Sequence, residues 1–228
     1  VILRGMGIGR IPVINVENAC ASASTAFNQA CAMVSAGLYD VVLALGVEKL
    51  YHEDKRRTFG AFTGAVDVEA LADIMASLKK GAESSGSSAA SAGAGEKRSM
   101  FMDIYAAAAR AHMDRYGTTA RHFAEISAKN SYHGSMNERA QFRDEMTADQ
   151  VLAAPMVAEP LTRPMCSPIG DGAAAAIVVS ERKARELGVR SPVRVVTTVL
   201  RSGWDHAYDE AGLAEVCAAQ AYEEAGIG

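Results

Sequence analysis

The chain has 228 residues, of which 49% are hydrophobic and 22% charged, and its formal net charge is −4 at pH 7. This composition is typical of a globular protein that buries one large core or two small ones. Both signs of charge are interspersed and only 6% of the residues are aromatic, which argues against nucleic acid as a partner. The apolar runs are shorter than the roughly 18 residues of a spanning helix, so we expect a cytoplasmic protein without membrane insertion.

The first part of the chain has the pattern of an α/β fold. Residues 11–16 (IPVINV) predict a strand, residues 21–36 predict a helix that ends at Gly37, and residues 40–46 (DVVLALG) predict a buried strand that stops at its glycine. A strand, a helix and a strand within a short span form a βαβ unit, which implies a parallel or mixed sheet covered on both faces. The predicted fold class is therefore α/β.

The middle of the chain begins with polar and charged residues. Residues 81–98 (GAESSGSSAASAGAGEKR) form a Gly/Ser/Ala tract, which predicts a flexible surface loop or a linker between domains. Helical periodicity follows over residues 101–116 and resumes after Thr118. Thr147 and Gln150 have the spacing of a helix capping box. We therefore expect a mainly helical insertion here.

The last part of the chain returns to the α/β pattern. A tight turn (MCSPIGDG) leads into an apolar strand and then a helix that begins at Glu181, and residues 193–200 (VRVVTTVL) predict a further strand. A final helix has one apolar face, formed by Leu213, Val216, Cys217 and Ala221. The pattern predicts a sheet-based core that carries the helical insertion.

Cys20 lies where a β-branched run gives way to small residues (ASASTA, residues 21–26). A helix with such small side chains can approach its neighbours on several sides, so we expect it to be buried. At the first turn of that helix, unpaired N–H groups and the helix dipole favour a thiolate and could hold an oxyanion. Cys20 is therefore a candidate nucleophile, and the alternative is that it only fills space in the core.

The other three cysteines provide a comparison. Cys31 and Cys217 lie among apolar helical residues, which favours core packing, and Cys166 lies in a turn of the type that lines clefts, where a structural role is still favoured. The four cysteines show neither a C-x-x-C pair nor a Cys/His cluster with zinc spacing. The sequence therefore predicts free thiols and no metal site.

Three separated motifs together resemble a known family. The segment VENACASASTAFNQACAMVSAGLYDVVLALGVEKL resembles the nucleophile region of the thiolase superfamily. The segments RYGTTARHFAEISAKNSYHGSMNERAQFRDEMTADQVL and PLTRPMCSPIGDGAAAAIVVSE resemble the sterol-carrier-protein-type branch, which includes acetyl-CoA acetyltransferase-like enzymes. The resemblance covers about residues 1 to 228 and implies a layered α/β/α/β/α core with an inserted helical cap.

The resemblance also implies a division of the chain. Residues 1–50 would be the end of the N-terminal thiolase half with the nucleophile helix, and residues 51–165 the cap and loop insertion, flexible at 81–98. Residues 166–184 would supply the closing strand of the N-terminal half, and residues 185–228 would begin the C-terminal half. Because the chain opens with Val1 inside an element and stops after a helical pattern, we expect it to be a segment of a longer polypeptide.

For function, the resemblance implies that Cys20 accepts an acyl group while its backbone N–H donates to the thioester oxygen. Cys20 would attack the 3-keto carbon of a 3-ketoacyl-CoA and pass the acyl group to CoA, and the reverse reaction would be a Claisen condensation. CoA and acyl-CoA are then substrates, and neither a metal nor a permanently bound cofactor is required. The resemblance further implies a homodimer or homotetramer, and a peroxisomal location if the source is eukaryotic.

The sequence departs from the family in its acid/base residues. The family supplies them from Gly-His-Pro, His-Asp-Ala-Phe and Cys-x-Gly motifs, none of which occurs here. The five histidines do not match those motifs. His112 and His122 fall in cap helices, and His133 lies in a cap motif where a structural hydrogen bond is expected. His52 is a weak candidate for lining the site, and His206 has no assigned role. We therefore expect the acid/base residues on sequence beyond Gly228.

The basic run at residues 55–57 also has two interpretations, since it could meet CoA phosphates but is more often a solvated charge cluster.

Two other functions remain open. A thiolase-fold carbon–carbon lyase of the retro-aldol type would work with a small zinc-ribbon/OB-fold partner protein, and the presence of Cys20 argues against it. A non-catalytic thiolase-like subunit with an assembly role is the other alternative. A ketosynthase also uses a cysteine at a helix start but would not carry the KNSYHGSMN cap motif.

Overall fold

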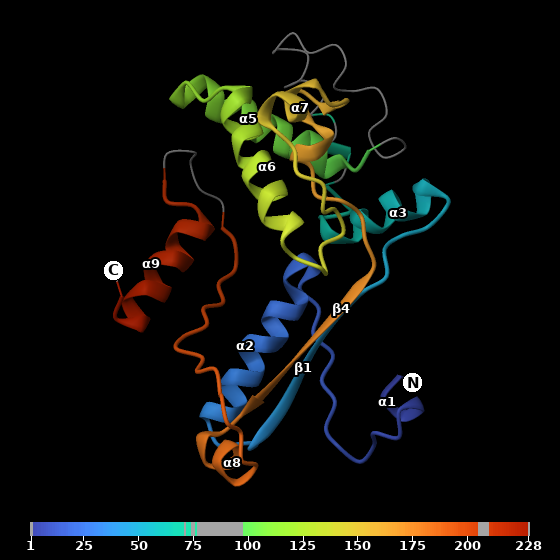
Figure 1. Ribbon diagram of the computed structural model, residues 1–228. Coiled ribbons are helices and arrows are strands. Elements are labelled where there is room, and N and C mark those ends of the chain that lie inside the picture. Colours follow the sequence, from blue (N-terminus) through green and yellow to red (C-terminus); the bar gives the residue numbers. More distant parts are fainter. Residues whose placement is uncertain (1, 71, 74–75, 77–97, 205–209, 228) are drawn as a thin grey trace. The chain divides into compact units, whose positions relative to one another are not determined.

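The structure is a computed structural model that describes residues 2–70, 72–73, 76, 98–204 and 210–227 (Figure 1). The chain forms two compact units: unit 1 comprises Val1–Val47 and Gly172–Gly228, and unit 2 comprises Glu48–Asp171. The predicted flexible tract lies outside the described residues except for Arg98. The four-part division implied by the resemblance stays a prediction.

Unit 1 is built on a pair of strands with a helix packed against it (Figure 1). The strands β1 and β4 are hydrogen-bonded neighbours. Since the N–H of Ser180, directly after β4, donates to the carbonyl of Asp40, directly before β1, at 2.9 Å, the pair is antiparallel. Its elements are α1 (Ile2–Gly5), the 3₁₀ turn η1 (Ala19–Ala21), α2 (Ser22–Ser35), β1 (Val41–Glu48), β4 (Gly172–Val179), α8 (Glu181–Glu186) and α9 (Leu213–Ala225).

A polar corner joins the start of β1 to the end of β4. The Ser180 hydroxyl donates to Asp40 Oδ1 at 2.7 Å, and Arg182 pairs with the other carboxylate oxygen of Asp40. The Ser180 hydroxyl, followed by Arg182, holds the pKa of Asp40 below its ordinary value. Ser180 also accepts from the N–H of Lys183 at 3.2 Å, so that the same residue caps α8. Ser180 therefore both links the two strands at this corner and caps the helix that follows.

Gly46 marks a close approach between α2 and β1. A Cβ at Gly46 would lie 2.6 Å from the Cβ of Ala23, so the glycine lets the small side chain of α2 reach the strand. The predicted strand is confirmed, but it continues through this glycine to Glu48, so Gly46 is a contact position and not a strand stop. The described residues cover one face of β1: Ala44 is buried, whereas the alternate residues Val41, Leu43, Leu45 and Val47 are exposed.

Two further predictions for unit 1 are wrong. Residues 11–16 and 193–200 form no strand, so the expected βαβ unit is not formed within the described residues. A strand requires a hydrogen-bonded neighbour, and the 193–200 segment is held by side chains instead. Asn28 of α2 donates through Nδ2 to the carbonyl of Thr198 at 2.9 Å, and Thr197 bonds to Glu224 of α9.

Helix α2 is also less buried than its small residues predict. Of its residues, Thr25, Ala30 and Cys31 are buried, whereas Ala23 and Ser24 are exposed. Small side chains permit close packing, but burial needs a neighbouring element on each side. The described residues supply such neighbours on some sides of the helix only.

Unit 2 is mainly helical, as the periodicity predicts (Figure 1). Its core contains the buried residues Ala124, Ala148 and Val151, and the buried Thr162 hydroxyl donates to the carbonyl of Val151 at 2.8 Å. Its elements are α3 (Lys55–Ala61), η2 (Phe62–Ala65), α5 (Met100–Tyr116), α6 (Ala120–Ser135), α7 (Ala148–Ala153), β2 (Met156–Ala158), β3 (Leu161–Thr162) and η3 (Arg163–Met165). Helix α3 lies in the polar stretch for which no helix was predicted.

Local capping explains where these helices begin and end. Gly117 ends α5 in the left-handed conformation with φ of 68°, which glycine adopts without strain. The predicted capping box is confirmed at α7, because the Thr147 N–H donates to Gln150 Oε1 at 2.8 Å and the Gln150 N–H donates to the Thr147 hydroxyl at 3.2 Å. At α6, the N–H of Thr119 donates to His122 Nδ1 at 3.0 Å, a capping role that the sequence did not indicate.

Candidate functional site

Cys20 lies in the 3₁₀ turn η1, directly before α2. The turn is entered through Ala19, whose φ of 45° falls in the left-handed region that alanine rarely adopts. Such backbone strain is concentrated at functional sites. The Cys20 residue is exposed, which contradicts the interpretation of this thiol as filler in a packed core.

Hydrogen bonds hold both peptide groups that flank Ala19. The Ala19 N–H donates to Glu17 Oε1 at 2.8 Å, and the Ala19 carbonyl lies 2.8 Å from the Ser22 hydroxyl and also accepts from the Ser22 N–H. The same Ser22 oxygen accepts from the N–H of Asn18 at 2.7 Å and lies 3.1 Å from Glu17 Oε1. The sequence alone singles out neither residue: Glu17 precedes the stretch of small residues and Ser22 is one of them.

The other cysteines differ from Cys20 in burial. Cys31 is 8% exposed, and burial raises the pKa of its thiol, as expected for core packing. Burial also raises the pKa of the half-buried Cys166, whose Sγ donates to the carbonyl of Thr162 at 3.5 Å. Cys217 is half-buried on α9, which has no fully buried residue. Cys20 is therefore the most accessible thiol of the four.

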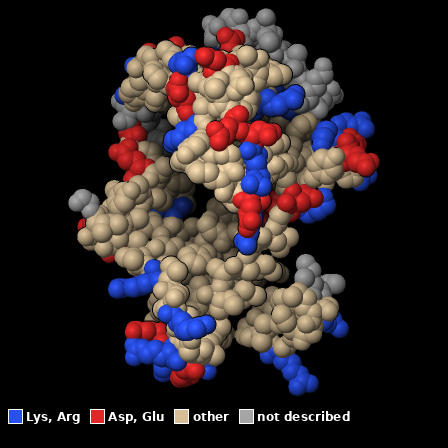
Figure 2. Space-filling view, viewed as in Figure 1, with Lys and Arg blue, Asp and Glu red and all other residues tan. Residues whose placement is uncertain are grey.

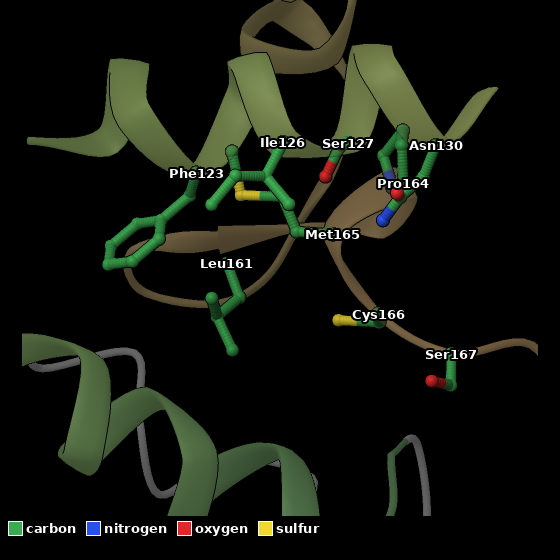
Figure 3. Close-up of a pocket in the computed structure, with 9 residues that line it drawn as sticks. All are labelled: Phe123, Ile126, Ser127, Asn130, Leu161, Pro164, Met165, Cys166 and Ser167. Carbon is green, nitrogen blue, oxygen red and sulfur yellow. The ribbon is translucent and has the colours of Figure 1, made fainter. Parts of the chain in front are cut away.

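Unit 2 contains a pocket of about 320 Å³ beside Cys166, shown in Figure 3. One face of α6 forms one wall and the segment 161–167 forms the opposite wall. Phe123 and Leu161 lie toward one end of the pocket, and Asn130, Cys166 and Ser167 lie toward the other. The lining residues are Phe123, Ile126, Ser127, Asn130, Leu161, Pro164, Met165, Cys166 and Ser167.

The turn that leads from this pocket to β4 is held at Asp171. Asp171 Oδ1 accepts from the N–H groups of Leu50 and Tyr51 at 2.8 and 2.7 Å, and Asp171 Oδ2 pairs with Lys49 Nζ at 2.5 Å. These bonds, led by that from Lys49, lower the pKa of Asp171 to about 2. On the same turn, the carbonyl of Ile169 accepts from Gln141 Nε2 at 3.2 Å. The first and last residues of unit 2 are thus tied together within that unit.

Asp171 should make the stability of the protein depend on pH. Its pKa is about 2 in the folded state against an ordinary value of 3.8, so its contribution is fully present above pH 3.8 and is lost as the pH falls through 2. We expect wild type to be more stable than Asp171→Asn above pH 4, and the difference to shrink toward pH 2. Urea unfolding of both proteins at pH 5, 3 and 2 measures this, and a difference that does not change with pH would contradict it.

His52 and His112 lie within hydrogen-bond distance of other groups in the chain. His52 Nδ1 accepts from the N–H of Asp54 at 2.9 Å, and His112 Nδ1 lies 2.9 Å from the Thr118 hydroxyl. His133 is exposed with its ring centroid 5.6 Å from that of Tyr132, and the structural hydrogen bond expected of its side chain is not found among the described residues. His206 lies outside the described residues.

The basic run at residues 55–57 forms the start of the short helix α3. Arg56 pairs with Asp54 at 3.1 Å, and Lys55 Nζ lies 4.1 Å from the centroid of the Tyr51 ring. These contacts occupy Arg56 and Lys55 within the chain, and a role in binding phosphates remains a prediction.

Figure 2 shows Lys and Arg side by side with Asp and Glu on the visible face. Within the described part of the chain, His, Cys, Asp and Glu form no group of three or more that could hold a metal ion. Among the same residues, no helix is both long and apolar enough to cross a membrane.

Comparisons with known proteins agree on a family. The chain is 34% identical over 232 residues to the benzoylsuccinyl-CoA thiolase subunit BbsB of Thauera aromatica, covering 100% of this chain and 54% of the relative. It is 36% identical over 197 residues to an acetyl-CoA acetyltransferase of Methanothermobacter thermautotrophicus, covering 86% of this chain and 45% of the relative. It is 30% identical over 235 residues to human sterol carrier protein 2, covering 99% of this chain and 40% of the relative. The chain thus spans about half the length of the relatives it matches or less.

A solved structure described as "Ltp2-ChsH2(DUF35) aldolase" has the same fold, with a TM-score of 0.66 at 21% identity over 100% of this chain and 55% of that one. This likeness confirms the predicted thiolase-like α/β fold. The family model for the thiolase N-terminal domain matches residues 2–182, which is most of the chain. The chain therefore belongs to the thiolase family, of which it carries the N-terminal domain.

Proposed function

We propose that the complete protein transfers acyl groups between CoA thioesters and that Cys20 is the residue that becomes acylated. The observation that carries the proposal is the exposed Cys20 thiol at the start of α2, within the residues that match the thiolase N-terminal domain. Two of the relatives are described as a thiolase subunit and an acetyl-CoA acetyltransferase, which supports CoA thioesters as the substrate class. A homodimer or homotetramer is part of the same proposal.

In the degradative direction, the Cys20 sulfur attacks the 3-keto carbon of a 3-ketoacyl-CoA. The bond between C2 and C3 breaks, and the C2 carbanion of the departing acetyl-CoA takes up a proton. The sulfur of free CoA then attacks the acyl–cysteine carbon, the bond to Cys20 breaks, and acyl-CoA leaves. The chain contains none of the family motifs for the acid/base residues that move these protons, so we propose that the rest of the protein supplies them.

Intact-mass measurement of the complete protein after incubation with acetyl-CoA tests the proposal. We expect the wild type to gain the mass of one acetyl group and Cys20→Ser to gain no stable thioester adduct. Cys31→Ser is the matched control, since Cys31 lies on α2, the helix that follows Cys20, but is buried, and it should be acylated like the wild type. An adduct that persists unchanged in Cys20→Ser would refute the assignment.

The alternative function is a retro-aldol lyase that acts with a zinc-ribbon/OB-fold partner protein. The solved structure of the same fold is described as an aldolase together with a DUF35 protein, which favours this alternative. Such a lyase would cleave a 3-hydroxyacyl-CoA without an acyl–cysteine intermediate. Lyase activity that needs the partner and survives Cys20→Ala would favour it over acyl transfer.

A further inference from the structure

We propose that Ser22 and Glu17 are positioning residues that aim the backbone N–H of Cys20 at the thioester oxygen. This inference rests on the proposed function, because it concerns the step in which Cys20 becomes acylated. Neither residue touches the substrate, and both act through the peptide group between Ala19 and Cys20.

The peptide group between Ala19 and Cys20 sets the direction of the Cys20 N–H. In a trans peptide the C=O and the following N–H lie in one plane and point in opposite directions. The Ala19 carbonyl and the Cys20 N–H belong to the same peptide. The Ser22 hydroxyl lies 2.8 Å from the Ala19 carbonyl oxygen, and the Ser22 N–H donates to that oxygen too. By holding the carbonyl toward α2, Ser22 directs the Cys20 N–H the opposite way.

The residues around Ala19 must hold this orientation of the peptide group. Ala19 has φ of 45°, a conformation that costs an alanine of order 1–2 kcal/mol and relaxes unless its surroundings hold it. Glu17 Oε1 accepts from the Ala19 N–H at 2.8 Å, so that the peptide before Ala19 is held as well as the peptide after it. Asn18 ties the turn to the body of the helix, since its Nδ2 donates to the buried Thr25 hydroxyl at 2.9 Å.

The Cys20 N–H is available to bind the thioester oxygen. Within the described residues this N–H has no hydrogen-bond acceptor, whereas the neighbouring Ala21 N–H donates to the carbonyl of Asn18 at 2.9 Å. During acylation, the Cys20 sulfur bonds to the thioester carbon and the carbonyl oxygen becomes an oxyanion. The carbonyl then re-forms as the CoA sulfur leaves with the bonding electrons and takes up a proton. A fixed N–H donor stabilises the oxyanion stage more than the ground state.

The test compares two reactions of the same thiol in the complete protein. Acylation by acetyl-CoA passes through an oxyanion, whereas alkylation by iodoacetamide does not. For Ser22→Ala we expect an acylation rate constant about 10- to 100-fold lower, with an unchanged KM for acetyl-CoA and an alkylation rate within about twofold of the wild type. Ser22→Thr should restore most of the acylation rate because it keeps the hydroxyl.

Variants at other positions complete the design. Glu17→Gln should keep the acylation rate because its amide oxygen can still accept from the Ala19 N–H, and Glu17→Ala should lower it. Ser24→Ala is the matched control, since Ser24 is on the same helix as Ser22 and, among the described residues, its hydroxyl donates only to the carbonyl of Ala21, at 3.0 Å. Equal losses of acylation and alkylation in Ser22→Ala, or no loss of either, would overturn the inference. A wild type that is never acylated would instead overturn the proposed function.

Discussion

Cys20→Ala in the complete protein is expected to lower kcat for acyl transfer by about 10⁴-fold or more, because the variant has no sulfur to accept the acyl group. Binding of acyl-CoA should change little, since the thiol contributes to the reaction and not to holding the substrate. Steady-state kinetics with a 3-ketoacyl-CoA and CoA measure kcat, and equilibrium titration measures the Kd of acyl-CoA. The expected result is therefore a large loss in kcat with a nearly constant Kd.

The control for this prediction is Cys31→Ala. Cys31 is buried on α2, which follows Cys20, so its loss leaves a small cavity and lowers stability, but kcat should stay within about threefold of the wild type. Wild-type turnover in Cys20→Ala would mean that acyl transfer proceeds without this thiol. Comparable losses of kcat in both variants would point to damage to the helix and not to the loss of a nucleophile.

Gly46→Ala is expected to destabilise unit 1 by about 1–3 kcal/mol, the usual cost of forcing a methyl group into packed structure. The added Cβ would lie 2.6 Å from the Cβ of Ala23, closer than two carbon atoms can approach, so α2 must move away from β1. Because Cys20 lies in the turn η1 that leads into α2, the shift should also lower the acylation rate. Urea unfolding gives the change in stability, and acetyl-CoA labelling gives the change in rate.

Two further variants separate this contact from a general effect of alanine in a strand. Gly172→Ala places the same methyl group on the paired strand β4, where nothing lies within 4 Å of the added Cβ, so its stability should equal or exceed that of the wild type. When Ala23→Gly is added to Gly46→Ala, the opposing Cβ is removed, and the double variant should regain part of the stability lost in Gly46→Ala. If Gly46→Ala were as stable as Gly172→Ala, the close approach of α2 and β1 would not matter to folding.

The elements that were predicted correctly are those with a local cause. The helical composition before Gly37, the apolar periodicity after residue 100 and the capping box at Thr147 each depend on residues close together in the sequence, and α2, α5, α6 and α7 form there. The motif that suggested Cys20 as the nucleophile is equally local. These signals also sufficed for the α/β class and for the family, which the comparisons show.

The elements that were mispredicted depend on distant partners. Residues 11–16 and 193–200 have strand composition, but a strand forms only beside another strand, and the sequence does not show where such a neighbour lies. Asp171 and Lys49 are 122 positions apart, so their pairing has no local pattern. Burial of α2 was overestimated for the same reason, since small residues permit neighbours without supplying them.

The surroundings of Cys20 could be predicted only in part. The small residues after Cys20 indicated that the helix can pack closely, and the contact between Ala23 and Gly46 agrees with this. The positive φ of Ala19 could not be predicted, because that conformation normally indicates glycine or asparagine. The bonds that Glu17 and Ser22 make to the two peptide groups flanking Ala19 depend on this conformation, so no sequence pattern predicts them.

The central claim is that the acyl group passes through Cys20 during turnover. Rapid chemical quenching of the complete protein with a 3-ketoacyl-CoA, followed by mass analysis of the cysteine-containing peptides, measures which thiol is acylated and how fast. We predict acyl label on the Cys20 peptide alone, formed at least as fast as kcat and lost when CoA is added. Label that forms more slowly than turnover, or that appears on the peptides of Cys31, Cys166 or Cys217 in place of Cys20, would contradict the claim.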